Sequence, residues 1–133
     1  MKYLLDANIL LEASLRRTHW EKAVEFLGTT PADQLAVANF SLHSMGFFLV
    51  PKTPRAFDAI ITDVLTRGIS ILQLPPAQLV RVTSVSEAQR LDFDDAFVYT
   101  ITEDHNLISV SFDADFDHTA RGRKTPEALL SAT

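Results

Sequence analysis

The chain contains no cysteine, which excludes disulfide bridges, thiolate zinc sites and cysteine nucleophiles together. Any metal ion must therefore be held by oxygen or imidazole ligands. Only four glycines occur in 133 residues, and neither a G-x-G-x-x-G pattern nor a Walker A sequence is present. We therefore expect no nucleotide cofactor held by a glycine-rich phosphate loop.

Long apolar stretches are also missing. No run approaches the ~20 residues that a membrane-spanning helix needs, and the amino terminus lacks the layout of a signal peptide. We expect a cytoplasmic protein without membrane contact. Positive charge is scarce, with a net charge of −5, so broad adhesion to nucleic acid is excluded and any such contact must be local. Basic clusters at 16–22 and 121–124 fit either a local contact or an ordinary solvated surface.

The chain has the length and the apolar content of one globular domain. Hydrophobic residues make up 47% of its 133 residues, enough to form a buried core. We find no internal repeat, low-complexity tract or linker-like stretch, so the sequence predicts a single domain over 1–133.

Short apolar runs alternate with stretches of helical periodicity along the whole chain. The runs predict strands at 2–5, 35–38, 69–72 and 107–110, and the periodic stretches predict helices at about 8–16, 20–28, 41–50, 53–68, 76–89, 92–103 and from 125 onward. The segment 119–123 is a weaker candidate for an edge strand. Because parallel strands need helical crossovers, this alternation predicts an α/β fold, a three-layer α/β/α sandwich around a central parallel sheet.

Acidic residues follow two of the predicted strands. Asp6 ends the first strand, Asp113 ends the fourth with Asp115 just beyond it, and Asp95 lies in the first turn of the helix at 92–103. Sites in parallel sheets form outside the carboxyl ends of the strands, so these carboxylates are expected to share one crevice. Their mutual repulsion favours a bound Mg²⁺ or Mn²⁺, an ion suited to phosphodiester hydrolysis.

Each acid also has a purely structural interpretation. Asp6 or Asn8 can cap the first helix, and Asp92 or Asp94 can cap a later one. Asp115 and its neighbour Asp117 have the composition of a turn. The presence of several acids at the same predicted end of the sheet favours the functional interpretation, because independent helix caps need not all lie there.

Two stretches together resemble the signatures of the PIN domain family, small metal-dependent ribonucleases that include the VapC-type toxins. They are "LLDANILLE" and "DFDDAFVYTITEDHNLISVSFDADF". The resemblance implies that Asp6, Asp95 and Asp113 are catalytic, metal-binding acids, with Asp115 as a further ligand and Asn8 as a polar helper. It also implies an RNA substrate, a Mg²⁺ or Mn²⁺ cofactor, a homodimer and a small antitoxin partner.

One departure from the family pattern concerns the helix after the second strand. The family usually carries a glutamate there, whereas "FSLHSMGFF" places Ser44 at that position, preceded by His43. The Ser44 hydroxyl can hold a water in place of the carboxylate, with His43 as an auxiliary phosphate contact or a half-buried polar residue. Three acids are candidate substitutes for the glutamate: Glu12, Asp33 and Asp117.

Two functions stay open from the sequence. One is a ribonuclease whose RNA contacts include a basic rim at Arg90, Arg121, Arg123 and Lys124. The other is a non-catalytic binding or scaffold module of the same fold, with a degraded metal site.

Overall fold

In the computed structural model, which describes residues 1–132, four short strands form a wholly parallel sheet. The strands are β1 (Tyr3–Leu5), β2 (Leu35–Ala38), β3 (Ser70–Leu72) and β4 (Ile108–Val110), in the spatial order β3-β2-β1-β4. All four predicted strands are confirmed to within one residue. The central parallel sheet predicted from the sequence is likewise confirmed.

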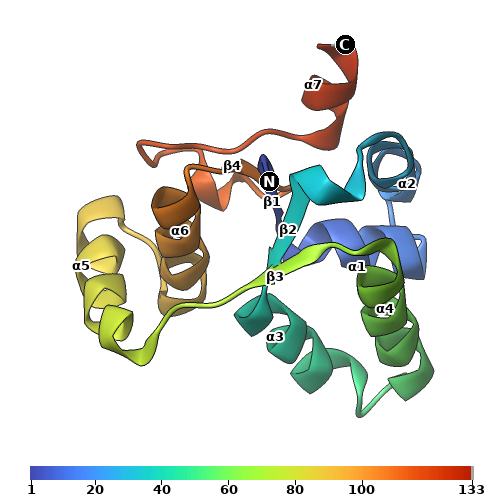
Figure 1. The fold of residues 1–133 in the computed structure, drawn as a ribbon, viewed down its shortest axis with the longest axis horizontal. Helices are drawn as coiled ribbons and strands as arrows, with labels where there is room; N and C mark the ends of the chain where they lie inside the picture. Colours follow the sequence, from blue (N-terminus) through green and yellow to red (C-terminus); the bar gives the residue numbers. More distant parts are fainter. Residues whose placement is uncertain (133) are drawn as a thin grey trace.

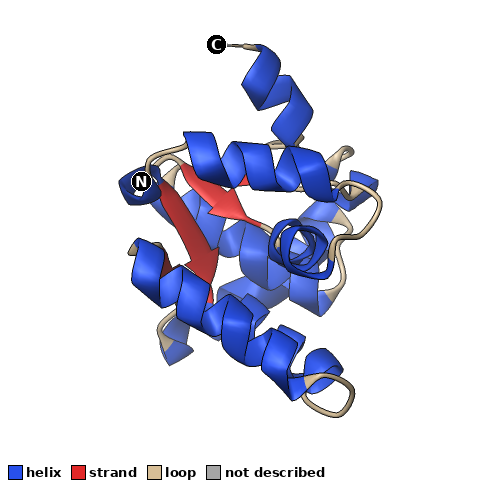
Figure 2. Ribbon diagram, turned by 90° about the vertical axis from the view of Figure 1, so that its right-hand side faces the viewer, coloured by secondary structure: helices blue, strands red, loops and turns tan. Residues whose placement is uncertain are grey.

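Seven α-helices surround this sheet within residues 1–132 (Figure 1). They are α1 (Ala7–Leu15), α2 (Trp20–Thr29), α3 (Asn39–Leu49), α4 (Pro54–Arg67), α5 (Leu79–Gln89), α6 (Phe93–His105) and α7 (Pro126–Ser131). Helices α1, α2, α3 and α4 pack against one face, and α5 and α6 pack against the other. Figure 2 shows the strands enclosed between helices, which is the three-layer α/β/α arrangement expected.

The strands are apolar on both faces because both faces are covered. Leu5 and Val37 point into the core under α1 to α4, whereas Leu4 and Ala36 point into the core under α5 and α6. All four residues are fully buried. Successive residues of one strand thus belong to two different cores, as the period of two in a β-strand requires.

Two details differ from the sequence prediction. Residues 119–123 form turns rather than an edge strand, and only the following Lys124 makes an isolated parallel bridge, to Val110. The helix expected from residue 76 begins as a 3₁₀ turn at Pro76–Gln78 before α5.

The strand order creates a switch point between β1 and β4. The chain leaves β1 toward β2 and β3, and later returns to place β4 on the other side of β1. Ligands of open parallel sheets bind outside the carboxyl ends of the strands at such a switch point. No helix within residues 1–132 has the length and apolar content needed to cross a bilayer.

Candidate functional site

Asp6 is the first residue after β1 and stands directly at the switch point. Its backbone N–H donates to the carbonyl of Val110 over 2.9 Å, which continues the β1–β4 ladder by one residue. Asp6 is also the residue before α1, but its side chain makes no capping hydrogen bond. The structure therefore gives this carboxylate a role other than the helix cap that the sequence left open.

The partner of Asp6 is the hydroxyl of Ser111, just after β4. Ser111 Oγ donates to Asp6 Oδ2 over 2.6 Å, and it accepts from Asn8 Nδ2 over 3.1 Å and from the Asp113 backbone N–H over 2.9 Å. Asn8 Oδ1 accepts from the Phe112 backbone N–H over 3.3 Å. Ser111 is fully buried, so one hydroxyl links the ends of β1, β4 and the start of α1.

Asp95 reaches the same edge from the first turn of α6. Asp92 caps this helix, because its side chain accepts from the Asp95 backbone N–H over 3.1 Å. A pocket of about 170 Å³ brings Asp95 together with Asp6, Ser44 and Asp94. Ser44 therefore lines the same pocket as three of the acids.

Asp115 joins from a short 3₁₀ turn, Ala114–Phe116. Its backbone N–H donates to Asp113 Oδ1 over 3.0 Å, and its side chain lines a pocket with Asp95. A second pocket, of about 380 Å³, contains Asp92, Asp95 and Asp115 beside Arg90 and His118. Asp95 lines both pockets, so the two adjoin at this residue.

The crowding of these acids appears in their pKa values. Burial, followed by the charges of Asp92, Asp6, Asp115 and Asp113, raises the pKa of Asp95 to about 7. Burial also raises the pKa of Asp6, opposed by the hydrogen bond from Ser111. Contact with Asp113 raises the pKa of Asp115. Burial and mutual repulsion both disfavour the charged form of a carboxyl, so these shifts are expected where several acids share one site.

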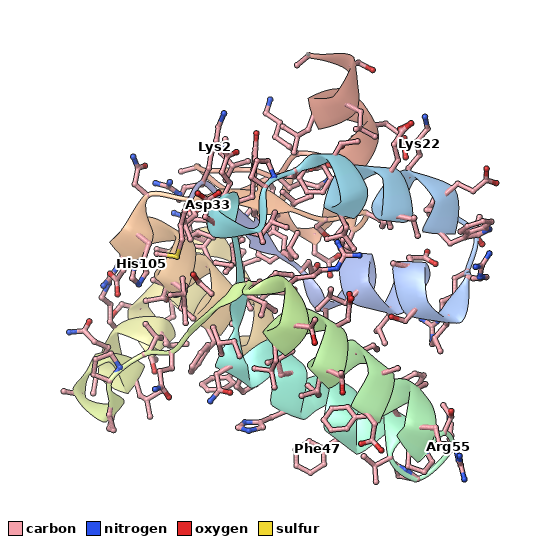
Figure 3. The ribbon with its side chains drawn as sticks, turned by 45° about the vertical axis from the view of Figure 1, so that its right-hand side comes forward. Lys2, Lys22, Asp33, Phe47, Arg55 and His105 are labelled. Carbon is pink, nitrogen blue, oxygen red and sulfur yellow. The ribbon has the colours of Figure 1, made fainter. Side chains whose placement is uncertain are left out.

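Several other predicted residues lie apart from this acidic cluster. His43 is exposed and lines an apolar pocket with Phe47 and Phe57. Figure 3 shows Phe47 projecting from the lower edge of the molecule. Asp33 precedes β2 and therefore lies at the opposite end of the sheet, beside Lys2 in the same view.

The four basic residues of the predicted rim occupy different places. Arg90, the residue after α5, lines the pocket of Asp95 and Asp115. Arg121 donates to Asn106 Oδ1 and to the carbonyl of Leu107, the residue before β4. It therefore lies at the end of the strand opposite the acidic residues. Two further rim residues lie near the end of β4: Arg123, whose guanidinium pairs with Asp117 and donates to the Ser111 carbonyl, and Lys124, which is exposed.

A match to a known family decides the identity of this fold. The PIN domain model matches residues 3–122. The chain belongs to the PIN domain family. No curated relative matches it in sequence.

Solved structures agree with this PIN domain in fold. PAE2754 from Pyrobaculum aerophilum is 24% identical, with a TM-score of 0.71 over 99% of this chain and 96% of that one. A toxin–antitoxin complex from Klebsiella pneumoniae is 19% identical, with a TM-score of 0.71 over 94% and 98%. VapC20 of Mycobacterium tuberculosis, a sarcin–ricin loop cleaving toxin, is 14% identical, with a TM-score of 0.75 over 92% and 100%.

PIN domains generally depend on divalent metal ions, and the donors present here fit such an ion in type. Asp6, Asp95, Asp113 and Asp115 offer only oxygen, which hard divalent cations prefer. Burial raises the pKa of Asp6 and of Asp95, and contact with Asp113 raises that of Asp115, a pattern expected for clustered carboxyls. Within residues 1–132, no three acidic or imidazole side chains are arranged as a preformed metal site.

Two residues of this PIN domain site were not singled out as site residues from the sequence. Ser111 is the centre of the hydrogen-bond network, but a serine in an apolar strand is usually unremarkable. Its position two residues before Asp113 was the only available clue. The sequence left open whether Asp92 or Asp94 caps the helix; the structure shows Asp92 as the cap and Asp94 in the first turn, where it lines the pocket of Asp6.

Proposed function

We propose that this PIN domain is a metal-dependent endoribonuclease that acts in the cytoplasm as the toxin of a toxin–antitoxin pair. One observation carries the proposal: the β1–β4 switch point and the start of α6 bring Asp6, Asp95, Asp113 and Asp115 to one edge of the sheet. Ligand sites of parallel sheets form at this edge, and clustered carboxylates attract a divalent cation.

In this proposal, Asp6, Asp95 and Asp113 hold Mg²⁺ or Mn²⁺, with Asp115 as a further ligand. When bound, the ion polarises the phosphoryl oxygen and lowers the pKa of water. Ser111 holds the Asp6 carboxylate in one orientation by donating a hydrogen bond to it, and Asn8 orients Ser111 by donating to its hydroxyl. Asp92 fixes the backbone turn that carries Asp95.

Asp94 is the proposed replacement for the missing glutamate. It shares one pocket with Ser44, Asp6 and Asp95. The three substitutes considered from the sequence have other surroundings: Asp33 lies at the opposite end of the sheet, Asp117 pairs with Arg123, and one Glu12 oxygen is buried without a partner in residues 1–132. We therefore assign the role of the missing glutamate to Asp94, which shares its pocket with Ser44.

Substrate binding is proposed to begin at Arg90, because its pocket also contains Asp95 and Asp115. Lys124 is exposed and available to a phosphate. Arg121 and Arg123 remain proposed contacts, although both guanidinium groups already donate to protein oxygens. His43 is proposed only as a peripheral auxiliary, given its separate pocket.

The proposed partners are a second copy of the chain and a small antitoxin. Structures of the same fold include toxin–antitoxin complexes from Klebsiella pneumoniae and, as VapBC2, from Rickettsia felis. The net charge of −5 suits a basic antitoxin segment that reaches the acidic edge. Molar mass measured by light scattering tests the homodimer.

Thermal unfolding with and without millimolar Mn²⁺ tests the metal site. We expect Mn²⁺ to raise the Tm of the parent protein, because an ion that binds only the folded state stabilises it. Asp6→Asn and Asp95→Asn should each abolish the rise. Asp33→Asn, at the other end of the sheet, is the matched control and should retain it.

The same assay tests the assignment of Asp94. Asp94→Asn should reduce the Mn²⁺ effect, and adding Ser44→Glu to that variant should restore it, because both side chains open into one pocket. RNA cleavage is then measured for every variant that binds the ion. A parent protein that Mn²⁺ leaves unchanged favours the alternative, a non-catalytic PIN module that uses the acidic edge to bind a protein.

A further inference from the structure

A half-exposed aromatic ring stands beside the acidic residues at the start of α6. Phe93 is 52% exposed, and its chain neighbours Asp92 and Asp94 each line one of the two acidic pockets. Its ring meets the Phe40 ring edge-on, with centroids 5.9 Å apart, and lies 6.1 Å from the Phe97 ring. Neighbouring rings thus hold Phe93 in place while about half of it faces solvent.

The aromatic group is continuous with the wall of the proposed catalytic pocket. Phe40 lines the pocket that contains Asp6 and Asp95. Phe40 and Phe97 are themselves stacked, with centroids 4.7 Å apart. Phe93 is therefore the solvent-facing member of a packed trio of rings, one ring away from the acids.

Cations around the acidic edge are too few to account for strong binding of a polyanion. The net charge is −5, and Arg90 is the one arginine or lysine that lines either acidic pocket in residues 1–132. Arg121 and Arg123 are already engaged by protein oxygens. Since phosphate contacts normally supply most of the affinity for nucleic acid, another source of binding is needed here.

We infer that Phe93 is a stacking platform for an unpaired nucleobase of the RNA. This inference rests on the proposed endoribonuclease function and names how that site takes its substrate. A base can stack on the ring only when it is released from a duplex, so the platform selects single-stranded or looped RNA. The stacked base fixes the position of the strand, and the neighbouring phosphate then falls at Asp6 and Asp95.

Steady-state cleavage of a short single-stranded RNA in Mn²⁺ tests the platform. We expect Phe93→Ala and Phe93→Leu to raise KM about tenfold or more while kcat stays close to that of the parent, because stacking contributes to binding rather than to chemistry. Phe93→Trp should retain a KM near that of the parent. Val80→Ala is the matched control, since Val80 is a 76% exposed apolar residue on α5.

Two further measurements separate the ways in which the inference can fail. The Mn²⁺-dependent rise in Tm should be the same in Phe93→Ala and in the parent, which shows an intact metal site. If the parent cleaves RNA and Phe93→Ala has an unchanged KM, the platform is wrong and the nuclease function stands.

Light scattering checks what else covers the ring. If the Phe93→Ala assembly has a different molar mass from the parent assembly, the ring belongs to an interface between copies of the chain. The inference is then overturned. If the parent neither binds Mn²⁺ nor cleaves RNA, the nuclease function and the platform fall together.

Discussion

At the residue scale, the Ser111 hydroxyl compensates in part for the burial of the Asp6 carboxylate. Removing a carboxylate from water is costly unless hydrogen bonds compensate. Ser111 donates to Asp6 and is itself oriented by Asn8 and by the Asp113 backbone N–H. A side chain with one donor and two acceptor sites uses all of them here, so Asp6 keeps a single orientation at the edge of the sheet.

Asp95 predicts how the metal-free protein responds to pH. Its pKa is about 7 in the folded state against an ordinary value of 3.8, so the folded protein binds more protons than the unfolded chain between those pH values. Stability should therefore fall as pH rises from about 4 to 7. The raised pKa values of Asp6 and Asp115 act in the same direction.

Urea denaturation in EDTA at several pH values between 4 and 8 measures this effect. Asp95→Asn should flatten the decline and be more stable than the parent at pH 8, whereas Asp33→Asn should follow the parent. A parent protein whose stability increases steadily from pH 4 to 7 would contradict the assigned shift.

The sequence predicted which acids gather, but not which residues organise them. Asp6, Asp95 and Asp113 are visible from the sequence because each follows a strand or opens a helix. The role of Ser111 depends on β4 lying beside β1, a pairing between segments 105 residues apart along the chain. Local pattern carries no information about such a contact.

At the element scale, the start of α6 is both a cap and part of the site. Asp92 accepts from the Asp95 backbone N–H, and the first turn also carries Asp94 and Asp95, where the helix dipole favours negative charge. After burial, repulsion from the Asp92 carboxylate is the next cause of the raised pKa of Asp95. The element therefore holds its acids close together at an electrostatic cost.

Separating these two roles of Asp92 needs two substitutions. Asp92→Ala should destabilise the protein by about 1 kcal/mol, because the cap is lost. Asp92→Asn keeps an acceptor for the Asp95 N–H and removes the charge, so its stability should stay close to that of the parent. Urea denaturation at pH 7 measures both, and equal losses in the two variants would show that charge rather than capping matters.

Elements with strong internal patterns were predictable, and those defined by their partners were not. Helix α4 starts at Pro54 after Thr53 and ends at Gly68, whose φ of 78° suits the left-handed conformation, as its sequence indicates. The segment 119–123 has no such pattern. Arg121 contacts the Tyr99 hydroxyl of α6 and the Leu107 carbonyl, and the Thr119 hydroxyl accepts from the Gly122 N–H. These contacts hold the segment in an irregular course, so the strand expected there does not form.

At the scale of the whole molecule, the sheet joins two cores into one cooperative unit. Leu4 and Leu5 are adjacent and fully buried, yet they pack into opposite cores. Leu4→Ala and Leu5→Ala should each cost about 2–5 kcal/mol, since each leaves a cavity. Because β1 contributes side chains to both hydrophobic cores, unfolding of either core should unfold the other.

The single tryptophan makes this prediction measurable. Trp20 lies at the start of α2, on the Leu5 side of the sheet. Its fluorescence should report the same urea midpoint as far-UV circular dichroism, in the parent and in both variants. A Leu4→Ala protein in which the dichroism midpoint falls and the Trp20 midpoint does not would show that the two cores unfold separately.

The pairing of β1 with β4 also determines when the acidic edge can first exist in a cell. Asp6 is synthesised before its partner Ser111, which follows 105 residues later. At roughly 5–20 residues per second, the ribosome needs about 5 to 20 s to supply it. A nascent chain that ends before Ser111 carries Asp6 without an assembled centre, so the ribosome that makes this protein is not exposed to the finished site until the last strand has been synthesised.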